Sequence, residues 1–461
     1  MLEAERQLEA PHGSFLGHVN VVVLTYALDG ALAFASGVLV ANGLGPDGRG
    51  AFSLFVVSTA IAQMTLGLGF GNAAVYFINK RELALGDVVS AAHVIALGSL
   101  AMTAAAVGAV APWAGGRVLG DQTSPWLLIA AVPMLVYAAA LRALLQALSR
   151  FLAMGVATLA QPLVMLALVA ADYAFGDPSP SLMVVFWMVS NATSALVSLA
   201  FLGITSVDLA QIVRPRWDVL RKLARFGVQG ETGNLLQLMN YRLDQYIVRA
   251  FVGLAGVGVY AVGVSMTEAV WMIANAVAIV LLPRLTSADD DDVRWLAPVI
   301  ARNTILVASC GAVALAIAAP VLVPAFFVDA YDDAVPVLWL LLPGTVALTG
   351  SKVLTSYIFS RGRPLVNTGI TLVSLAVTVV ALLALVPAFG VKGAAAASSI
   401  AYVAHFAAAV YAYRRISGAP ALEAVLPRPS DAHLYVDALR GVLARVSRRP
   451  VPSTTPPVRG G

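Results

Sequence analysis

Three cations lie inside apolar stretches of the sequence, where a charged side chain is rare. They are Arg142, Arg242 and Lys352. A charge at the centre of a membrane-spanning helix costs about 2.5 to 3.5 kcal/mol on insertion scales, so such groups usually face a water-filled cavity or one another. In a chamber of low dielectric constant, guanidinium and ammonium groups form charge-assisted hydrogen bonds with phosphate oxygens. The three cations therefore predict an anion-binding cavity, and the alternative for Arg142 and Lys352 is snorkelling to the nearer membrane interface.

Five acidic or amide side chains occur at comparable depth: Asp29, Glu231, Asn234, Asp244 and Glu268. Glu231 and Asn234 fall on one helix face, in the most polar of the apolar stretches. Asp29 lies about midway along the first apolar stretch, where a carboxyl group could exchange a proton as a cavity opens to either side. We expect these residues to line the cavity or to couple an ion. The alternative is that some of them only satisfy one another across neighbouring helices.

The sequence lacks the residue patterns of several other chemistries. No Gly-x-x-x-x-Gly-Lys-Ser/Thr loop for ATP hydrolysis occurs. The single cysteine, Cys310, excludes a disulfide framework, and the five histidines have no metal-ligand spacing. The loops on the predicted outer side are too short for a membrane glycosyltransferase or a polymerase. We therefore predict no catalytic residue, no metal and no cofactor, in a protein that is not an enzyme.

The composition indicates that a membrane-embedded, all-α scaffold positions these side chains. Of 461 residues, 59% are hydrophobic and 12% are charged, about half the charged fraction of a soluble domain. In water this chain would expose large apolar surfaces, which a bilayer solvates without cost. Apolar windows of about 20 residues recur along the chain. Twelve are predicted as membrane helices, over residues 18–42, 51–78, 88–112, 125–148, 151–175, 182–204, 226–250, 258–282, 296–319, 335–359, 365–386 and 393–413.

The basic residues predict the orientation of these helices. About fifteen Lys and Arg side chains fall on one set of connections and about four on the other. Under the positive-inside rule, this places both termini in the cytoplasm and the protein in the cytoplasmic (inner) membrane. The net charge of +4 arises from these short loops and the C-terminal tail rather than from one basic face, so no nucleic-acid partner is expected.

Two pairs of similar sequence segments, called echoes below, predict an internal repeat. The turn at residues 45–52 matches residues 253–260 at an offset of 208, and 148–150 match 359–361 at an offset of 211. Nearly equal offsets indicate two parallel six-helix halves with pseudo-twofold symmetry around a central cavity. The second echo also puts Arg142 and Lys352 at nearly equivalent positions, facing the cavity from opposite walls.

The repeat and the composition together predict five segments. They are a cytoplasmic N-terminal segment (1–17), an N-terminal six-helix half (18–204), a cytoplasmic amphipathic linker (205–225), a C-terminal six-helix half (226–415) and a partly disordered cytoplasmic tail (416–461). Within the tail, the helical spacing of apolar residues predicts a short helix on anionic lipid, and the alternative is simple disorder.

Several motifs resemble one family of membrane proteins. They are the turn at 44–52, Gly67-Leu68-Gly69, the stretch 72–78, Asn240-Tyr241-Arg242-Leu243-Asp244 and Pro283-Arg284-Leu285. With twelve helices in two halves, this pattern resembles the Wzx-like oligosaccharide flippases of the superfamily that holds the MATE antiporters and the lipid II flippase MurJ. MurJ-like proteins carry two further helices where this chain has a polar tail, so lipid II is the less expected cargo.

The resemblance implies transport of an undecaprenyl-diphosphate-linked oligosaccharide across the membrane, by alternating access, for exopolysaccharide, O-antigen or a related surface glycan. Membrane lipid and polysaccharide polymerase or export proteins are the implied partners. The main alternative is a MATE-like antiporter that exchanges an organic cation for H⁺ or Na⁺ and uses acidic residues in the cavity. A non-transporting scaffold and a membrane enzyme are the remaining alternatives. Intramembrane charge in both halves disfavours the scaffold, and the short outer loops disfavour the enzyme.

Overall fold

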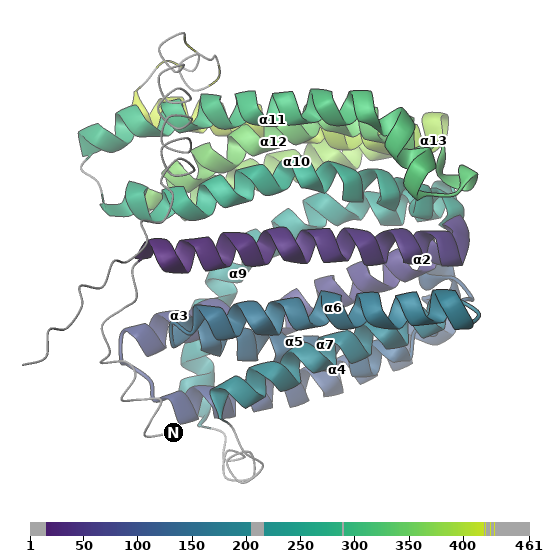
Figure 1. Ribbon diagram of the computed structural model, residues 1–461. Coiled ribbons are helices and arrows are strands. Elements are labelled where there is room, and N and C mark those ends of the chain that lie inside the picture. The colour runs from purple at the N-terminus through teal and green to yellow at the C-terminus, as the bar shows by residue number, and fades with distance from the viewer. Residues whose placement is uncertain are drawn as a thin grey trace, which may run out of the picture.

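The computed structural model describes residues 15–203, 216–287 and 290–418, with a few isolated positions after 418. In these ranges the protein is all-α, and its long helices run side by side in one bundle (Figure 1). The elements are α2 (Phe15–Leu66), α3 (Phe70–Asn79), α4 (Leu85–Leu119), α5 (Leu127–Ala147), α6 (Phe151–Phe175), α7 (Pro180–Leu202), α9 (Trp217–Phe251), α10 (Leu254–Ser287), α11 (Asp290–Phe326), the 3-10 turn η2 (Asp329–Tyr331), α12 (Ala334–Ser360) and α13 (Pro364–Ser417).

Two of these helices contain a sharp elbow and each provides two of the predicted spans. Gly45 in α2 has a φ of 66° and Gly390 in α13 a φ of 57°, values that favour glycine because it has no Cβ. With each elbow counted as a break, the described residues contain twelve long helical segments, in agreement with the twelve predicted spans. The short α3 continues the second segment after a break at Leu68 and Gly69, which both have positive φ.

Most predicted boundaries fall within a few residues of the observed ones, and the linker is the main difference. Helix α6 spans the predicted residues 151–175, and α7 begins at Pro180 after the N-cap Ser179. The predicted linker 205–225 lies partly outside the described residues, but Trp217–Arg225 forms the first turns of α9. The helix predicted in the tail lies outside the described residues.

The helices suit a bilayer rather than water. By length and composition, eight of the described helices could cross a membrane, with each elbowed helix counted once. Helix α9 is too polar for that set, and the part of α10 from Leu254 to Val270 is a shorter apolar segment. Large apolar side chains such as Phe175 and Leu365 are 94% and 83% exposed, which is expected where lipid is the solvent. The chain is a multi-pass membrane protein.

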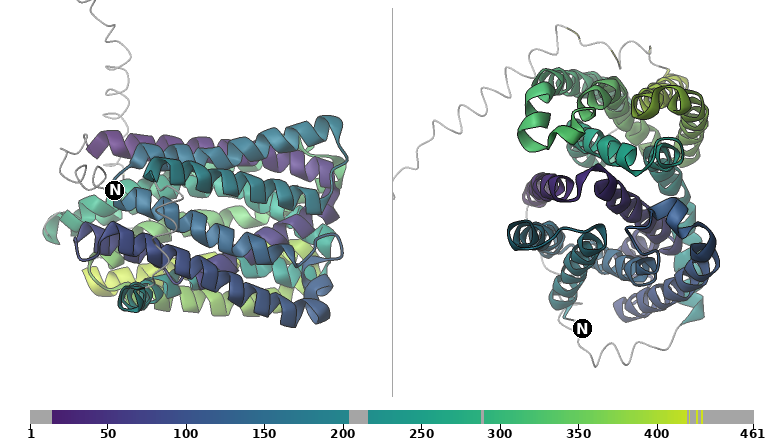
Figure 2. Two further views of the ribbon diagram at one scale, coloured as in Figure 1. Left: turned by 90° about the horizontal axis from the view of Figure 1, so that it is seen from below. Right: turned by 90° about the vertical axis from the view of Figure 1, so that its right-hand side faces the viewer.

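The bundle has two halves. Seen end-on in the right-hand view of Figure 2, the helices before residue 203 form one group and those after residue 254 form another. Helix α9 belongs to both groups. Its Val219 and Leu223 lie in the apolar core of the first half, while Val248 lies in a core shared with α12 and α13.

Candidate functional site

A cavity of about 850 Å³ lies between the two halves. Its walls come mainly from α2, α9, α10 and α11, and most of its lining side chains are apolar. The charged residues that line it are Asp29, Arg49, Arg242 and Glu268. The cavity therefore collects side chains from both halves and balances two cations against two carboxylates. Its volume falls within the range of about 300 to 1,000 Å³ typical of small-molecule sites.

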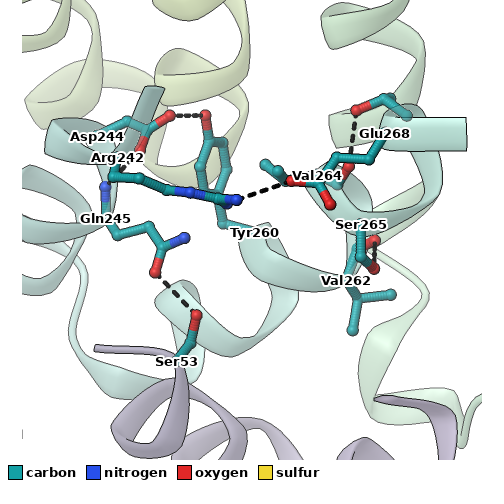
Figure 3. A network of polar contacts seen from close by, with 10 residues as sticks. Ser53, Arg242, Asp244, Gln245, Tyr260, Val262, Val264, Ser265 and Glu268 are labelled. Atoms are coloured by element: carbon teal, nitrogen blue, oxygen red, sulfur yellow. Dashed lines mark hydrogen bonds and ion pairs between the residues drawn. The ribbon is translucent and has the colours of Figure 1, made fainter. Parts of the chain in front are cut away.

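Arg242 and Glu268 form an ion pair across the cavity wall. Arg242 Nη2 lies 2.9 Å from Glu268 Oε1, and this contact joins α9 to α10 (Figure 3). The two side chains are 31% and 41% exposed, so both remain accessible from the cavity. Because the pair is only partly desolvated, a ligand anion can compete with Glu268 for the guanidinium.

Asp244 has a different environment from its neighbour Arg242. It is 2% exposed, accepts hydrogen bonds from Tyr260 Oη at 2.5 Å and Ser398 Oγ at 3.2 Å, and lines neither this cavity nor the smaller ones described below. On the same helix, Asn240 is buried against α13, where it donates to Ser374 Oγ at 3.0 Å. The polar surface of α9 is therefore divided: one side fastens the helix to α10 and α13, and the other faces the cavity.

Arg49 is a cavity residue that the sequence interpretation missed. Its Cζ atom lies over the ring of Phe52, 5.8 Å from the ring centroid. The guanidinium is within electrostatic range of Glu268 and Tyr331. Its Nε atom is buried and has no hydrogen-bond partner among the described residues. The position after a Gly-Pro-Asp-Gly turn indicated an outer loop. The shortness of that turn is the signal that could have identified Arg49, because the next helix begins directly after the turn.

A side pocket of about 380 Å³ lies beside the central cavity within the N-terminal half. Tyr26 and Asp29 line both spaces, so the two adjoin at these residues. Arg142 lines the side pocket, where its Nη1 donates to Ser194 Oγ at 3.3 Å and its charge lies within electrostatic range of Asp29. The structure thus brings Arg142 and Asp29 together.

Glu231 and Asn234 lie in a third pocket, of about 260 Å³, between α9 and α3. Glu231 Oε2 accepts hydrogen bonds from Asn72 at 3.3 Å and from Asn234 at 3.2 Å. These predicted residues share one helix face, as their spacing indicated, but they line a space separate from the one that holds Arg242.

Lys352 does not line the side pocket that holds Arg142. It is half-buried on α12, within electrostatic range of His405 on α13, and it is not among the residues that line the three pockets above.

The predicted equivalence of Arg142 and Lys352 needs a correction of register. At the end of α5 the amide of Ser149 bonds Gln146 O, and at the end of α12 the amide of Gly362 bonds Phe359 O in the same pattern. Ser149 and Gly362 also share a positive φ, of 55° and 69°. The two helix ends therefore match at an offset of 213 rather than 211. Arg142 then corresponds to Thr355, and Lys352 lies nearly one helical turn away.

Three hydrogen bonds join the two halves at the α2 elbow, beside the central cavity. Asn42 Nδ2 donates to Phe326 O at 2.8 Å, and Asn42 Oδ1 accepts from the amide of Val328 at 3.1 Å. Tyr331 Oη donates to Ala41 O at 2.9 Å. Because these bonds join the N-terminal half to the end of α11 and to η2, any opening at this end must break them.

The fold resembles that of solved membrane transporters. The chain superposes on an inward-facing multidrug MATE transporter with a TM-score of 0.67 at 14% identity, covering 86% of this chain and 98% of that one. It superposes on the lipid II flippase MurJ in an inward closed conformation with a TM-score of 0.66 at 12% identity, covering 93% of each chain. A Pyrococcus furiosus transporter of the MOP superfamily, described by the reverse polarity of its binding pocket, gives a TM-score of 0.57 at 14% identity over 87% of this chain and 94% of that one. The fold is therefore that of the MOP superfamily of transporters.

The sequence itself gives the family. Residues 39–336 match the model of the polysaccharide biosynthesis protein family, and the chain belongs to that family. No curated protein matches the chain significantly.

Proposed function

We propose that this protein is a flippase, not an enzyme, which carries an undecaprenyl-diphosphate-linked oligosaccharide across the cytoplasmic membrane for export of a cell-surface glycan. Membership of the polysaccharide biosynthesis family supports the class of cargo. The observation that carries the proposal is Arg49, whose guanidinium lines the central cavity and whose buried Nε has no acceptor among the described residues. A buried cation without a full set of acceptors is stabilised by a ligand that brings oxygen anions.

Different cavity residues would contact different parts of the head group. Arg49 and Arg242 would bind the diphosphate, with Glu268 releasing Arg242 as the phosphate oxygens replace its carboxylate. Arg142 would contact the head group from the side pocket. Lys352 would reach it only in a conformation that turns α12 toward the cavity. The polyprenyl tail stays in lipid, so rocking of the two halves moves only the polar head.

Ion coupling and topology complete the proposal. Asp29 lines both the central cavity and the side pocket, and this position supports a role for its carboxyl group in coupling cargo movement to proton movement. Glu231, Asn234 and Glu268 are further polar candidates for coupling, whereas the burial of Asp244 favours a structural role. Both termini would lie in the cytoplasm, where polymerase and export proteins for the same glycan would be the partners.

The test compares Arg49 variants with a matched control. Glycan export is measured in a strain that lacks the chromosomal copy and carries Arg49→Ala, Arg49→Lys or Arg117→Ala, the last at an exposed cation outside the cavity. We expect Arg49→Ala to abolish export at normal membrane abundance, Arg49→Lys to retain part of it, and Arg117→Ala to match the wild type. Wild-type export by Arg49→Ala would overturn the proposed diphosphate site.

A MATE-like antiporter of organic cations is the second candidate. The observation in its favour is that Asp29 and Glu268 both line the central cavity, where two carboxylates could hold a cation. Drug-efflux assays on the same strains separate the two functions. Efflux that depends on Asp29 but not on Arg49, with no effect of either residue on glycan export, would favour the antiporter.

A further inference from the structure

The side pocket differs in chemistry from the central cavity beside it. The central cavity is mostly apolar around its charges, whereas most of the residues that line the side pocket between α2, α5, α6 and α7 are polar. Three amides line it, from Gln146, Gln161 and Asn191, together with the hydroxyls of Thr158 and Ser194. At about 30 Å³ for each molecule in the liquid, its volume corresponds to roughly a dozen waters. A ligand with many hydroxyl groups could replace such waters and keep their hydrogen bonds.

The amides retain capacity for a ligand. Gln161 Nε2 donates to Ser190 Oγ at 3.4 Å, and Asn191 Nδ2 donates to Trp187 O at 2.8 Å. Each of these groups has a second N–H and a carbonyl oxygen in addition. A planar amide both donates and accepts, which matches a pair of neighbouring hydroxyls on a sugar ring.

The two charges in the pocket favour a neutral ligand. Arg142 lines the pocket, and its hydrogen bond to Ser194 uses one of the five N–H donors of a guanidinium group. Asp29 supplies an acceptor within electrostatic range of that guanidinium, and the two form no ion pair within 4 Å in the described part of the chain. An anion would be repelled by Asp29 and a cation by Arg142. Hydroxyl groups can instead accept from one and donate to the other.

Aromatic rings complete the lining. Tyr26 stands where the side pocket meets the central cavity, and Phe151 lines the pocket at the start of α6. An aromatic side chain offers an apolar body to the C–H face of a sugar, and Tyr adds a hydroxyl. The pocket therefore presents amides, hydroxyls, the opposite charges of Asp29 and Arg142, and apolar ring faces.

We propose that this side pocket is a saccharide subsite, which receives the sugar attached to the diphosphate and so determines which glycan is carried. The inference rests on the proposed flippase function, because the diphosphate in the central cavity would direct the first sugar toward Tyr26 and Asp29. The residues that discriminate between sugars would be Thr158, Gln161 and Asn191, which contact hydroxyls rather than phosphate.

The test uses the full-length protein in detergent or nanodiscs, with two probes. One is undecaprenyl diphosphate without a sugar, and the other is undecaprenyl diphosphate that bears the glycan extracted from the native host. The variants are Gln161→Leu and Thr158→Val, which keep side-chain volume and remove polar atoms. The matched control is Thr193→Val on α7, outside the pocket lining.

We expect each pocket variant to weaken binding of the sugar-bearing probe by about three- to tenfold, which corresponds to one or two neutral hydrogen bonds. Binding of the sugarless probe should stay unchanged, and Thr193→Val should match the wild type with both probes. Equal weakening of both probes, or no weakening of either, would overturn the saccharide subsite.

The same binding measurements give a different pattern if the proposed flippase function itself is wrong. If the sugarless probe does not bind, or binds equally well to Arg49→Ala, the diphosphate site is wrong and the flippase proposal fails. If that probe binds in an Arg49-dependent manner but the wild type does not prefer the sugar-bearing probe, only the saccharide subsite is overturned.

Discussion

The backbone of Gly50 packs directly against the carbonyl oxygen of Leu254, where the two halves of the bundle meet. Gly258 makes the same contact with the carbonyl oxygen of Pro46. Gly258 and Leu254 follow Gly50 and Pro46 at the 208-residue offset of the sequence repeat, so the two contacts are related by the pseudo-twofold axis. As in a symmetric dimer, each half presents the same surface to the other.

This reciprocal contact predicts that alanine at Gly50 or Gly258 opens the elbow end of the cavity. A Cβ at either position would overlap a backbone carbonyl, which cannot rotate away as a side chain could. We expect Gly50→Ala and Gly258→Ala to shift the protein toward a state in which Ser53→Cys, on the cavity wall, reacts with an impermeant thiol reagent from the elbow side. The background would carry Cys310→Ser.

Gly108→Ala is the control for that measurement, because a Cβ there meets nothing within 4 Å. It should leave the labelling rate of Ser53→Cys unchanged. An unchanged rate in Gly50→Ala as well would mean that the glycine contact does not hold the halves together.

The orientation of the bundle gives a second prediction. Asp177, between α6 and α7, is exposed at the elbow end, whereas Lys80, at the end of α3, is exposed at the other end. A cysteine at Asp177 should react with an impermeant maleimide in intact cells, and one at Lys80 should react only after the membrane is permeabilised. The reverse pattern would contradict cytoplasmic termini and the direction of transport proposed here.

The fold was largely predictable from the sequence because its signals are local. The run from Phe151 to Phe175 is bounded by Arg150 and Gly176, so composition alone locates α6. The elbow at Gly45 was predicted as a turn for the same reason, since a Gly-Pro pair interrupts an apolar run.

The site was less predictable because it depends on which side of a helix faces which neighbour. Asp244 and Arg242 are two residues apart on α9, and nothing in their spacing tells which one α10 and α13 cover. The equivalence of Arg142 and Lys352 depended on a register error of two residues, which rotates a helical position by about half a turn. Arg49 was counted as a loop charge because its depth depends on tertiary packing.

Asp244 provides a third prediction, which distinguishes an effect on stability from an effect on transport. Tyr260→Phe removes the 2.5 Å hydrogen bond to its carboxylate and leaves a buried acceptor with fewer partners. We expect a loss of stability of about 1 to 3 kcal/mol, measured as a lower temperature of thermal unfolding in detergent. Transport per folded molecule should change little, because neither residue lines the central cavity.

The control for the Asp244 site is Tyr246→Phe on the same helix, whose hydroxyl shares a part-buried 2.7 Å hydrogen bond with Ser58. It should cost less stability than Tyr260→Phe, since water can replace a partner at a part-buried site. A large loss of transport at unchanged stability in Tyr260→Phe would instead support a coupling role for Asp244.

Asp29 provides the last prediction, because it is the acidic residue shared by the central cavity and the side pocket. Asp29→Asn keeps the shape of the side chain and removes its charge, so Arg142 loses its electrostatic neighbour while the pocket keeps its volume. We expect glycan export to fall at normal membrane abundance, with binding of sugarless undecaprenyl diphosphate retained. The dependence of export on the proton gradient distinguishes the two roles of the carboxylate. If Asp29 serves only to balance Arg142, Asp29→Asn lowers export by the same factor with and without a proton gradient. If Asp29 couples proton movement to the change between states, export by Asp29→Asn no longer responds to the gradient.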